Sequence, residues 1–260
     1  MISSTANQHV KQVAALMKKA RLRKELRLYV VEGLRMCREL PADQVEMVYV
    51  SQSFAANPAH RELLERFRFE EVRDDVFKSM SDTQTPQGIL ALVKQASYSL
   101  EEILSGQGPA HLMILETIQD PGNLGTIIRA GEGAGLTGVI MNSSTADIYN
   151  PKVIRSTMGS IYRVPFLYTE DLPGTIKRLK EKNIRLFAAH LKGENNYEEE
   201  DYTGNTGFLI GNEAKGLSDE ISAMADTYVR IPMLGQVESL NAAVASSILM
   251  YEAARQRRKH

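Results

Sequence analysis

The sequence predicts an α/β protein in two parts, an N-terminal α/β unit over residues 1–95 and a second α/β unit over residues 110–260. Short apolar runs of strand length alternate with helical segments along the whole chain. A polar stretch containing serine and glycine, residues 96–109, separates two such series and is the expected linker. The composition, 43% hydrophobic and 24% charged, is that of a chain with a real core.

The first unit opens with a basic amphipathic segment over residues 8–27, in which Val10, Val13, Leu16 and Met17 share one side of a helix. The expected helices cover residues 8–27, 33–40 and 61–67, and the expected strands cover residues 28–31, 45–50 and 89–93. A proline-glycine turn at residues 86–88 precedes the last strand. Alternating strands and helices indicate a layered α/β sandwich.

The second unit continues the alternation with strands that are apolar throughout. The expected strands cover residues 112–115, 139–141, 164–166, 185–189, 207–210 and 228–231, and the expected helices cover residues 124–132, 173–182 and 240–255. Strands without polar alternation, separated by helices, are typical of a parallel sheet buried on both faces.

The net charge is close to zero, but the charged residues are unevenly distributed along the chain. The formal net charge is −1, whereas residues 1–40 hold nine Lys or Arg and three Asp or Glu. Six of these basic residues fall within ten positions, and such a cluster could neutralise several phosphates of a nucleic acid. They are Lys18, Lys19, Arg21, Arg23, Lys24 and Arg27. A solvated helix face carrying long basic side chains is the alternative interpretation.

Several classes of protein are disfavoured by what the sequence contains. Cys37 is the one cysteine, so no intramolecular disulfide can form, which fits a reducing cytoplasm. The five histidines lack paired ligand spacing, so we expect no metal site. No apolar run approaches the ~18 residues of a membrane span, and no signal core is present. We therefore expect a soluble cytoplasmic protein.

Three loops at the carboxyl ends of expected strands could carry chemistry, because ligands bind at that edge of an open α/β sheet. In the first loop, residues 116–129, a proline-glycine turn precedes Asn123, which we expect to be a helix N-cap. Arg129 follows less than two turns later and does not share a helix face with Asn123. A capping asparagine and a surface arginine would explain the same residues.

The second loop, residues 208–217, follows an apolar strand. Gly211 would let the backbone approach a ligand closely, and Glu213 lies between two glycines. The third loop, residues 231–241, leads into a helix rich in alanine and serine, with Ser239 as the expected N-cap. A routine strand-to-helix turn and a capped core helix are the respective alternatives.

A glycine-rich segment at residues 131–135 imitates a dinucleotide-binding fingerprint. A genuine fingerprint follows a strand and opens a helix. This segment closes an expected helix and precedes a strand, so its glycines indicate a helix end and a turn. We therefore do not expect nicotinamide or flavin binding.

Taken together and in this order, the three loops resemble those of the SpoU/TrmH family within the SPOUT superfamily of methyltransferases. The resemblance covers about residues 110–258. The N-terminal unit resembles the substrate-binding domain of two-domain members, which is similar to RNA-binding ribosomal proteins. The matching stretches are residues 2–4, 7–11, 30–33 and 86–89.

The resemblance implies a deep trefoil knot in the C-terminal unit, an obligate homodimer and S-adenosylmethionine as cofactor. It implies methylation of a ribose 2′-oxygen in RNA, most often large-subunit ribosomal RNA (23S in bacteria). The functional polar residues would be Asn123, Arg129, Glu213, Ser239 and Asn241. Cofactor contacts would come from Gly211, Ile231 and Leu240, largely through the backbone, with Ala189, His190 and Leu191 nearby.

The role of Arg129 has two interpretations. The family's mechanism would make it the base that removes the hydroxyl proton, but arginine side chains stay protonated in proteins. Arg129 could instead bind phosphate or stabilise the developing alkoxide.

Other functions also stay open, namely a non-catalytic RNA-binding or ribosome-assembly protein, a base methyltransferase of the same superfamily, and an oxidoreductase.

Overall fold

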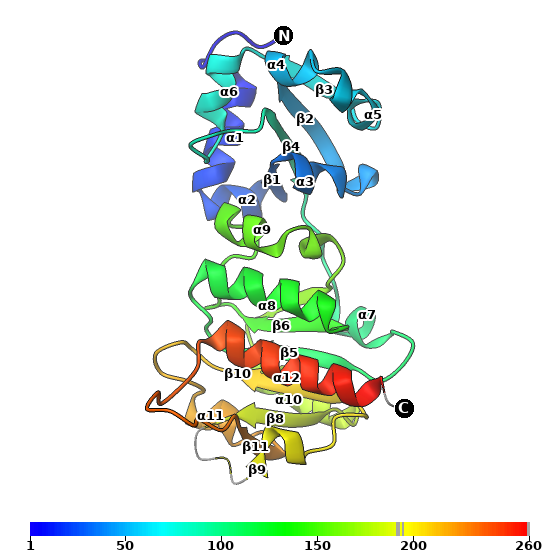
Figure 1. Cartoon of the computed structure of the whole chain (residues 1–260), viewed down its shortest axis with the longest axis vertical. Coiled ribbons are helices and arrows are strands. Elements are labelled where there is room, and N and C mark those ends of the chain that lie inside the picture. Colours follow the sequence, from blue (N-terminus) through cyan, green and yellow to red (C-terminus); the bar gives the residue numbers. More distant parts are fainter. Residues whose placement is uncertain (191–192, 194, 259–260) are drawn as a thin grey trace. The chain divides into compact units, whose positions relative to one another are not determined.

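The computed structural model describes residues 1–190, 193 and 195–258, and the chain divides into two compact units (Figure 1). Unit 1 comprises residues 1–96 together with residues 147–162, and unit 2 comprises residues 97–146 and the chain from residue 163 onward. The chain therefore passes between the units three times, at residues 96–97, 146–147 and 162–163.

Unit 1 is a four-stranded sheet in the order β1-β4-β2-β3. β1 and β2 both run antiparallel to β4, and β3 runs parallel to β2. The strands are β1 (Leu28–Glu32), β2 (Val45–Ser51), β3 (Phe69–Val72) and β4 (Ile89–Lys94). The helices are α1 (Gln8–Lys18), α2 (Ala20–Leu26), α3 (Leu34–Arg38), α4 (Gln52–Ala55), α5 (Arg61–Leu64), α6 (Asp74–Met80) and α9 (Pro151–Thr157).

The core of unit 1 confirms the amphipathic pattern read from its first helix. The four residues Val10, Val13, Leu16 and Met17 are buried together with apolar side chains of the sheet and α6. The expected single helix over residues 8–27 is wrong, however, because Lys19 adopts an extended conformation and divides it into α1 and α2.

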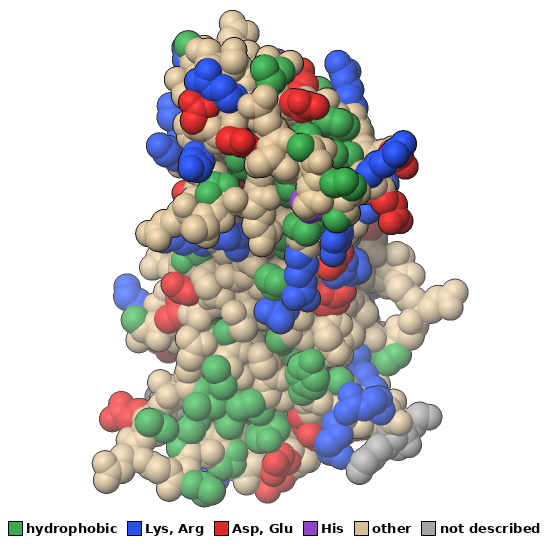
Figure 2. All heavy atoms as spheres, turned by 45° about the horizontal axis from the view of Figure 1, so that its top comes forward, with side chains coloured by type: hydrophobic (Ala, Val, Ile, Leu, Met, Phe, Trp, Pro, Cys, Tyr) green, Lys and Arg blue, Asp and Glu red, His purple; other side chains and the backbone are tan. Residues whose placement is uncertain are grey.

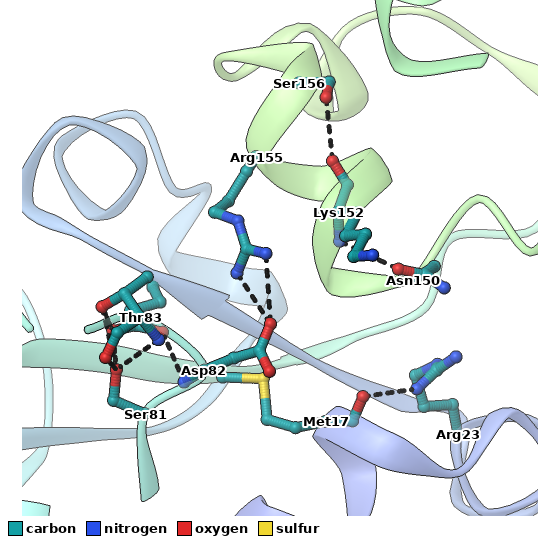
Figure 3. Close-up of polar contacts among 10 residues, drawn as sticks. Met17, Arg23, Ser81, Asp82, Thr83, Asn150, Lys152, Arg155 and Ser156 are labelled. Atoms are coloured by element: carbon teal, nitrogen blue, oxygen red, sulfur yellow. Dashed lines mark hydrogen bonds and ion pairs between the residues drawn. The ribbon is translucent and has the colours of Figure 1, made fainter. Parts of the chain in front are cut away.

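The segment of residues 147–162 belongs to unit 1 although it follows β6 in sequence. Asp147 accepts two hydrogen bonds from the guanidinium of Arg23, at 2.9 Å from Nε and 2.7 Å from Nη2. The same guanidinium donates to the carbonyl oxygens of Leu16 and Met17 near the end of α1. On the other side of α9, Arg155 forms an ion pair with Asp82 (Figure 3). Charged hydrogen bonds thus hold α9 in unit 1.

Unit 2 is a seven-stranded sheet in the order β7-β6-β5-β10-β8-β11-β9, and its paired strands all run parallel. The strands are β5 (His111–Leu115), β6 (Gly138–Asn142), β7 (Phe166–Thr169), β8 (Arg185–Ala189), β9 (Asn195–Asn196), β10 (Thr206–Ile210) and β11 (Thr227–Arg230). The predicted α/β class with a parallel sheet is confirmed, and the trefoil knot stays a prediction.

Helices cover both faces of this sheet, as the apolar strands require. α7 (Leu100–Leu104), α10 (Leu172–Glu181) and α11 (Asp219–Ser222) contribute to one core with residues of the central strands, including Leu112, Ile140 and Leu209. On the opposite face, α8 (Pro121–Gly133) and α12 (Ala242–Arg257) pack against each other (Figure 1). The expected strand over residues 164–166 begins later, at Phe166, because Pro165 has no N–H for the strand ladder.

Two findings concern membranes and metals. No helix in the described part of the chain is long and apolar enough to cross a bilayer. Among the same residues, no group of three or more His, Cys, Asp or Glu side chains is arranged to hold a metal ion.

Candidate active site

The three loops singled out in the sequence meet at the carboxyl edge of the parallel sheet of unit 2. β5 and β10 are neighbouring strands, so the chain leaves both at the same edge. Glu213, three residues after β10, accepts hydrogen bonds from the backbone N–H groups of Gln119 at 3.1 Å and Asp120 at 3.0 Å. The second loop thereby fixes the path of the first.

A chain of hydrogen bonds then joins all three loops. The Nδ2 of Asn123 donates to Glu213 at 3.0 Å, and the Nδ2 of Asn241 donates to the Oδ1 of Asn123 at 2.8 Å. The Oδ1 of Asn241 accepts from the backbone N–H groups of Ala243 and Val244 at the start of α12. This orientation of Asn241 leaves its amide donors for Asn123, and each amide in the chain is consistently oriented.

The electrostatics of Glu213 follow from these contacts. Burial acts to raise the pKa of its carboxyl group, but the hydrogen bonds from Asn123, Asp120 and Gln119 outweigh it and hold the pKa below its usual range. Glu213 is therefore a fixed negative charge at neutral pH, surrounded by donors that orient it.

Both expected helix caps are wrong. Asp120 is the N-cap of α8, because its side chain accepts the N–H of Asn123, and Asn123 lies inside the first turn. Asn241, not Ser239, is the N-cap of α12. A helix cap that also donates to a second loop is held in one orientation, so Asn241 has both a structural and an organising role.

Arg129 and Ser239 lie outside the chain of hydrogen bonds. Arg129 is exposed on α8, and the structure gives it no hydrogen bond or ion pair with the residues that it describes. Ser239 is exposed in the loop before α12 and lines the cavity of about 380 Å³ that is described next. The structure thus brings together Asn123, Glu213 and Asn241 of the five predicted polar residues.

A cavity of about 380 Å³ lies beside this hydrogen-bonded chain. Its wall includes five of the residues expected to contact a cofactor, namely Ala189, His190, Gly211, Ile231 and Leu240. The sixth, Leu191, lies outside the described residues. Sequence reasoning missed Lys215, Arg230 and Met233, which also line the cavity. Lys215 could have been found from its place between Glu213 and Gly216.

Gly211 shapes the cavity by close backbone approach. A Cβ atom at this position would lie 2.1 Å from the carbonyl carbon of Gly216 and from the nitrogen of Leu217. The loop closes on itself through reciprocal backbone hydrogen bonds between Asn212 and Gly216, and Gly216 has a φ of +71°. The backbone of Gly211 therefore packs directly on that of Gly216 and Leu217, and a side chain at residue 211 has no room.

The six basic residues expected to bind RNA belong to unit 1. Lys18, Lys19, Arg21, Lys24 and Arg27 are exposed around α1 and α2. Arg23 differs, because its side chain is 3% exposed and its guanidinium is occupied by Asp147 and the carbonyl oxygens of α1. The expectation for Arg23 is therefore corrected, since it has a structural role.

Models of two protein families match the chain. Residues 110–251 match the SpoU rRNA methylase family, and residues 7–91 match the MRM3-like substrate binding domain.

Known proteins are similar over much of the chain. A 23S rRNA (guanosine(2553)-2′-O)-methyltransferase, RlmP of Bacillus subtilis, is 33% identical over 68% of this chain and 69% of its own. A 23S rRNA (guanosine-2′-O-)-methyltransferase, RlmB of Bordetella pertussis, is 35% identical over 66% and 71%.

Among solved structures, the SpoU methyltransferase AviRb of Streptomyces viridochromogenes, in complex with the cofactor AdoMet, has a TM-score of 0.87 and 28% identity. That comparison covers 97% of this chain and 98% of AviRb. An RNA 2′-O ribose methyltransferase has a TM-score of 0.83 and 31% identity over 99% of both chains. With its family match, its relatives and a shared fold along its length, the chain belongs to the SpoU rRNA methylase family.

Proposed function

We propose that this protein transfers a methyl group from S-adenosylmethionine to a ribose 2′-oxygen of large-subunit ribosomal RNA. The observation that best supports this proposal is the chain of hydrogen bonds Glu213–Asn123–Asn241, which joins the three loops of the family's pattern beside one cavity. Two curated relatives bear the name of this reaction on 23S rRNA. Ribosomal RNA as substrate places the reaction in the cytoplasm.

The cavity suits the proposed cofactor. Backbone groups around Gly211 can pair with the edges of a purine and a ribose, whereas Ile231 and Leu240 offer apolar surface. We also assign contacts with S-adenosylmethionine to Ala189, His190 and Leu191. When bound, S-adenosylmethionine would supply a methyl group on a sulfonium sulfur; a ribose oxygen would attack the methyl carbon in line as the carbon–sulfur bond breaks and a neutral thioether leaves.

The residues of this chain would position the attacking ribose. Asn123, which is bonded to the cavity residue Glu213, and Ser239, which lines the cavity, would orient the nucleotide, and Glu213 would hold the loop of Asn123 in place. Arg129 stays protonated and stabilises the negative charge that develops on the 2′-oxygen as the ribose hydroxyl loses its proton to solvent. Fixing the oxygen and the methyl carbon in line supplies much of the rate.

Residues 1–95 would bind the substrate RNA, and residues 110–260 would form the methyltransferase domain across the linker 96–109. Lys18, Lys19, Arg21, Lys24 and Arg27 are free to contact phosphates because their side chains are exposed. The 2′-hydroxyl itself distinguishes RNA from DNA, so no further discrimination is needed at the reacting atom.

A homodimer is part of the proposal. Val244 and Tyr251, two turns apart on α12, are 48% and 47% exposed, although α12 is otherwise largely buried. Leu234 and Val237 in the preceding loop are exposed as well. Figure 2 shows hydrophobic side chains gathered over the part of the surface that unit 2 provides at the bottom of the view. A second copy of the chain would cover this apolar surface.

Tritium transfer from labelled S-adenosylmethionine to unmodified 23S rRNA, followed by nuclease digestion and mass spectrometry, tests the function. We expect one 2′-O-methylated nucleotide, with Arg129→Ala abolishing transfer and leaving cofactor affinity within about tenfold. Label on a base would refute ribose methylation. Binding of RNA without any transfer would show a non-catalytic RNA-binding protein instead.

A further inference from the structure

Thr117, two residues after the end of β5, adopts a backbone conformation that its side chain disfavours. Its φ is +60°, in the left-handed region. A β-branched residue is rarely found there, since its Cβ substituents crowd the backbone. Such a conformation persists only where the surroundings impose it, and it often marks a functional loop.

Two asparagines impose this conformation from the strands on either side of β5. Asn142, the last residue of β6, accepts the N–H of Thr117 at 2.9 Å and donates its Nδ2 to the Thr117 hydroxyl oxygen at 2.9 Å. Asn212, two residues after β10, donates its Nδ2 to the Thr117 carbonyl oxygen at 2.9 Å. All the backbone polar groups of Thr117 are thus held by side chains of neighbouring strand ends.

The hydrogen bonds from Asn142 and Asn212 to Thr117 lie at the start of the loop that carries the proposed catalytic groups. Gln119 and Asp120, which donate to Glu213, lie two and three residues after Thr117, and α8 with Asn123 and Arg129 follows them. The direction in which the chain leaves β5 is set at Thr117, so a change of φ there would displace everything after it. Asn142 is itself held, because its Oδ1 also accepts the Thr145 hydroxyl at 2.9 Å.

We propose that Asn142 is a positioning residue for methyl transfer, which acts by keeping Thr117 in the left-handed conformation that aims Asn123 and Arg129 at the ribose. The inference rests on the proposed function and adds a residue outside the three loops of the family pattern. Asn142 does not line the cavity described above, so its effect falls on turnover and not on cofactor affinity.

The test compares Asn142→Leu, which removes both hydrogen bonds at similar size, with Asn142→Asp, which keeps an acceptor for the Thr117 N–H. Tritium transfer from S-adenosylmethionine to unmodified 23S rRNA is measured with the full-length protein. We expect Asn142→Leu to lower kcat by about tenfold to a hundredfold, and Asn142→Asp to restore most of it. Cofactor affinity by calorimetry stays within about threefold.

Thr117→Gly gives an independent test, because glycine adopts a positive φ without being held. In the Gly background, we expect Asn142→Leu to lower kcat by a smaller factor than in the Thr background. Equal losses in both backgrounds would show that Asn142 does not act through the conformation of Thr117, and would overturn the proposal.

The matched control is Asn205→Leu. Asn205 accepts the N–H of Ala110 at 2.8 Å, just before β5, as Asn142 accepts that of Thr117 just after it. We expect Asn205→Leu to lower the melting temperature and to leave kcat unchanged. If Asn205→Leu lowers kcat as much as Asn142→Leu does, the effect of Asn142 is purely structural and the proposal is overturned. If the unaltered protein transfers no methyl group, the proposed function fails. If the unaltered protein transfers the methyl group and Asn142→Leu has the same kcat, only the inference about Asn142 fails.

Discussion

At the residue scale, Glu213 is exposed, yet its carboxylate joins two loops of the site. Its two carboxylate oxygens accept from the N–H groups of Gln119 and Asp120 and from the amide of Asn123. A carboxylate is the one side-chain group that can accept from all of these donors and contribute none of its own. It therefore binds the first loop to the second without a competing donor.

Glu213→Gln should separate this role from that of a simple surface charge. The glutamine would turn an amide N–H toward groups that themselves donate, so we expect kcat for RNA methylation to fall by about tenfold to a hundredfold. Tritium transfer measures this, with Glu220→Gln on α11 as the control. Equal activity of both variants would contradict the role assigned to Glu213.

His111 lies at the opposite edge of the sheet and leads to a pH effect on stability. It is 1% exposed, and its ring lies against the backbone of Ala134 and Gly135, with no hydrogen bond of ordinary geometry to either ring nitrogen from the described residues. Burial, with Arg257 nearby, lowers its pKa from 6.5 to about 4. The unfolded chain therefore binds a proton below pH 6.5 that the folded chain refuses, so stability is lost as the pH falls from 6.5 toward 4.

The expected loss is about 3 kcal/mol of unfolding free energy between pH 7 and pH 4 from this one group. Urea unfolding at several pH values measures it, and His111→Leu should flatten the dependence over that window. A curve for His111→Leu parallel to that of the unaltered protein would show that other groups cause the loss.

At the element scale, the short turn after β10 depends on the absence of a side chain at Gly211. In Gly211→Ala, the new Cβ atom would meet the backbone of Gly216 and Leu217, so the loop must open. We expect a loss of cofactor affinity of more than about tenfold and a destabilisation of about 2 kcal/mol. Calorimetric titration and thermal unfolding measure both.

Gly204→Ala is the matched control for Gly211→Ala, because nothing lies within 4 Å of a Cβ atom built at Gly204. It should leave cofactor affinity unchanged. A Gly211→Ala variant that binds the cofactor as well as Gly204→Ala does would show that the loop tolerates opening.

Strand positions were the easiest elements to predict from the sequence, and helix ends the hardest. Buried parallel strands are continuous apolar runs, so the expected strand over residues 185–189 coincides with β8. The break at Lys19 has no local signal. Just before it, the carbonyl oxygens of Leu16 and Met17 accept from the guanidinium of Arg23, whose partner Asp147 lies 124 residues away in the sequence. A tertiary ion pair of that kind leaves no periodic pattern.

The same reason separates the parts of the site that the sequence predicts from those that it does not. Gly211 and Glu213 stand out because the strand before them is apolar and the loop is rich in glycine. Asn142 and Thr117 look like ordinary polar residues after strands, and their pairing depends on β5 and β6 being neighbours. Residues 150–157 offered a cap and a proline but little apolar periodicity, so α9 was missed.

At the scale of the whole molecule, the exposed apolar residues of α12 give the proposed dimer a direct test. Tyr251→Asp would place a charge on that surface, which costs several kcal/mol if a partner covers it. We expect sedimentation to show a shift from dimer to monomer and methylation to fall in parallel. Leu26→Asp, at another exposed hydrophobic residue, should leave sedimentation unchanged. A monomeric unaltered protein would contradict the dimer.

The three passages of the chain between the units bear on how the protein could be cut or recombined. Unit 1 is complete only with residues 147–162, where Tyr149 packs on Tyr29 with ring centres 4.5 Å apart and Asp147 holds Arg23. A protease nick within residues 97–109 would therefore leave the fragments bound to each other. Gene fusions that exchange residues 1–96 between relatives would inherit a mismatched α9, and should transfer substrate choice only when residues 147–162 travel with them.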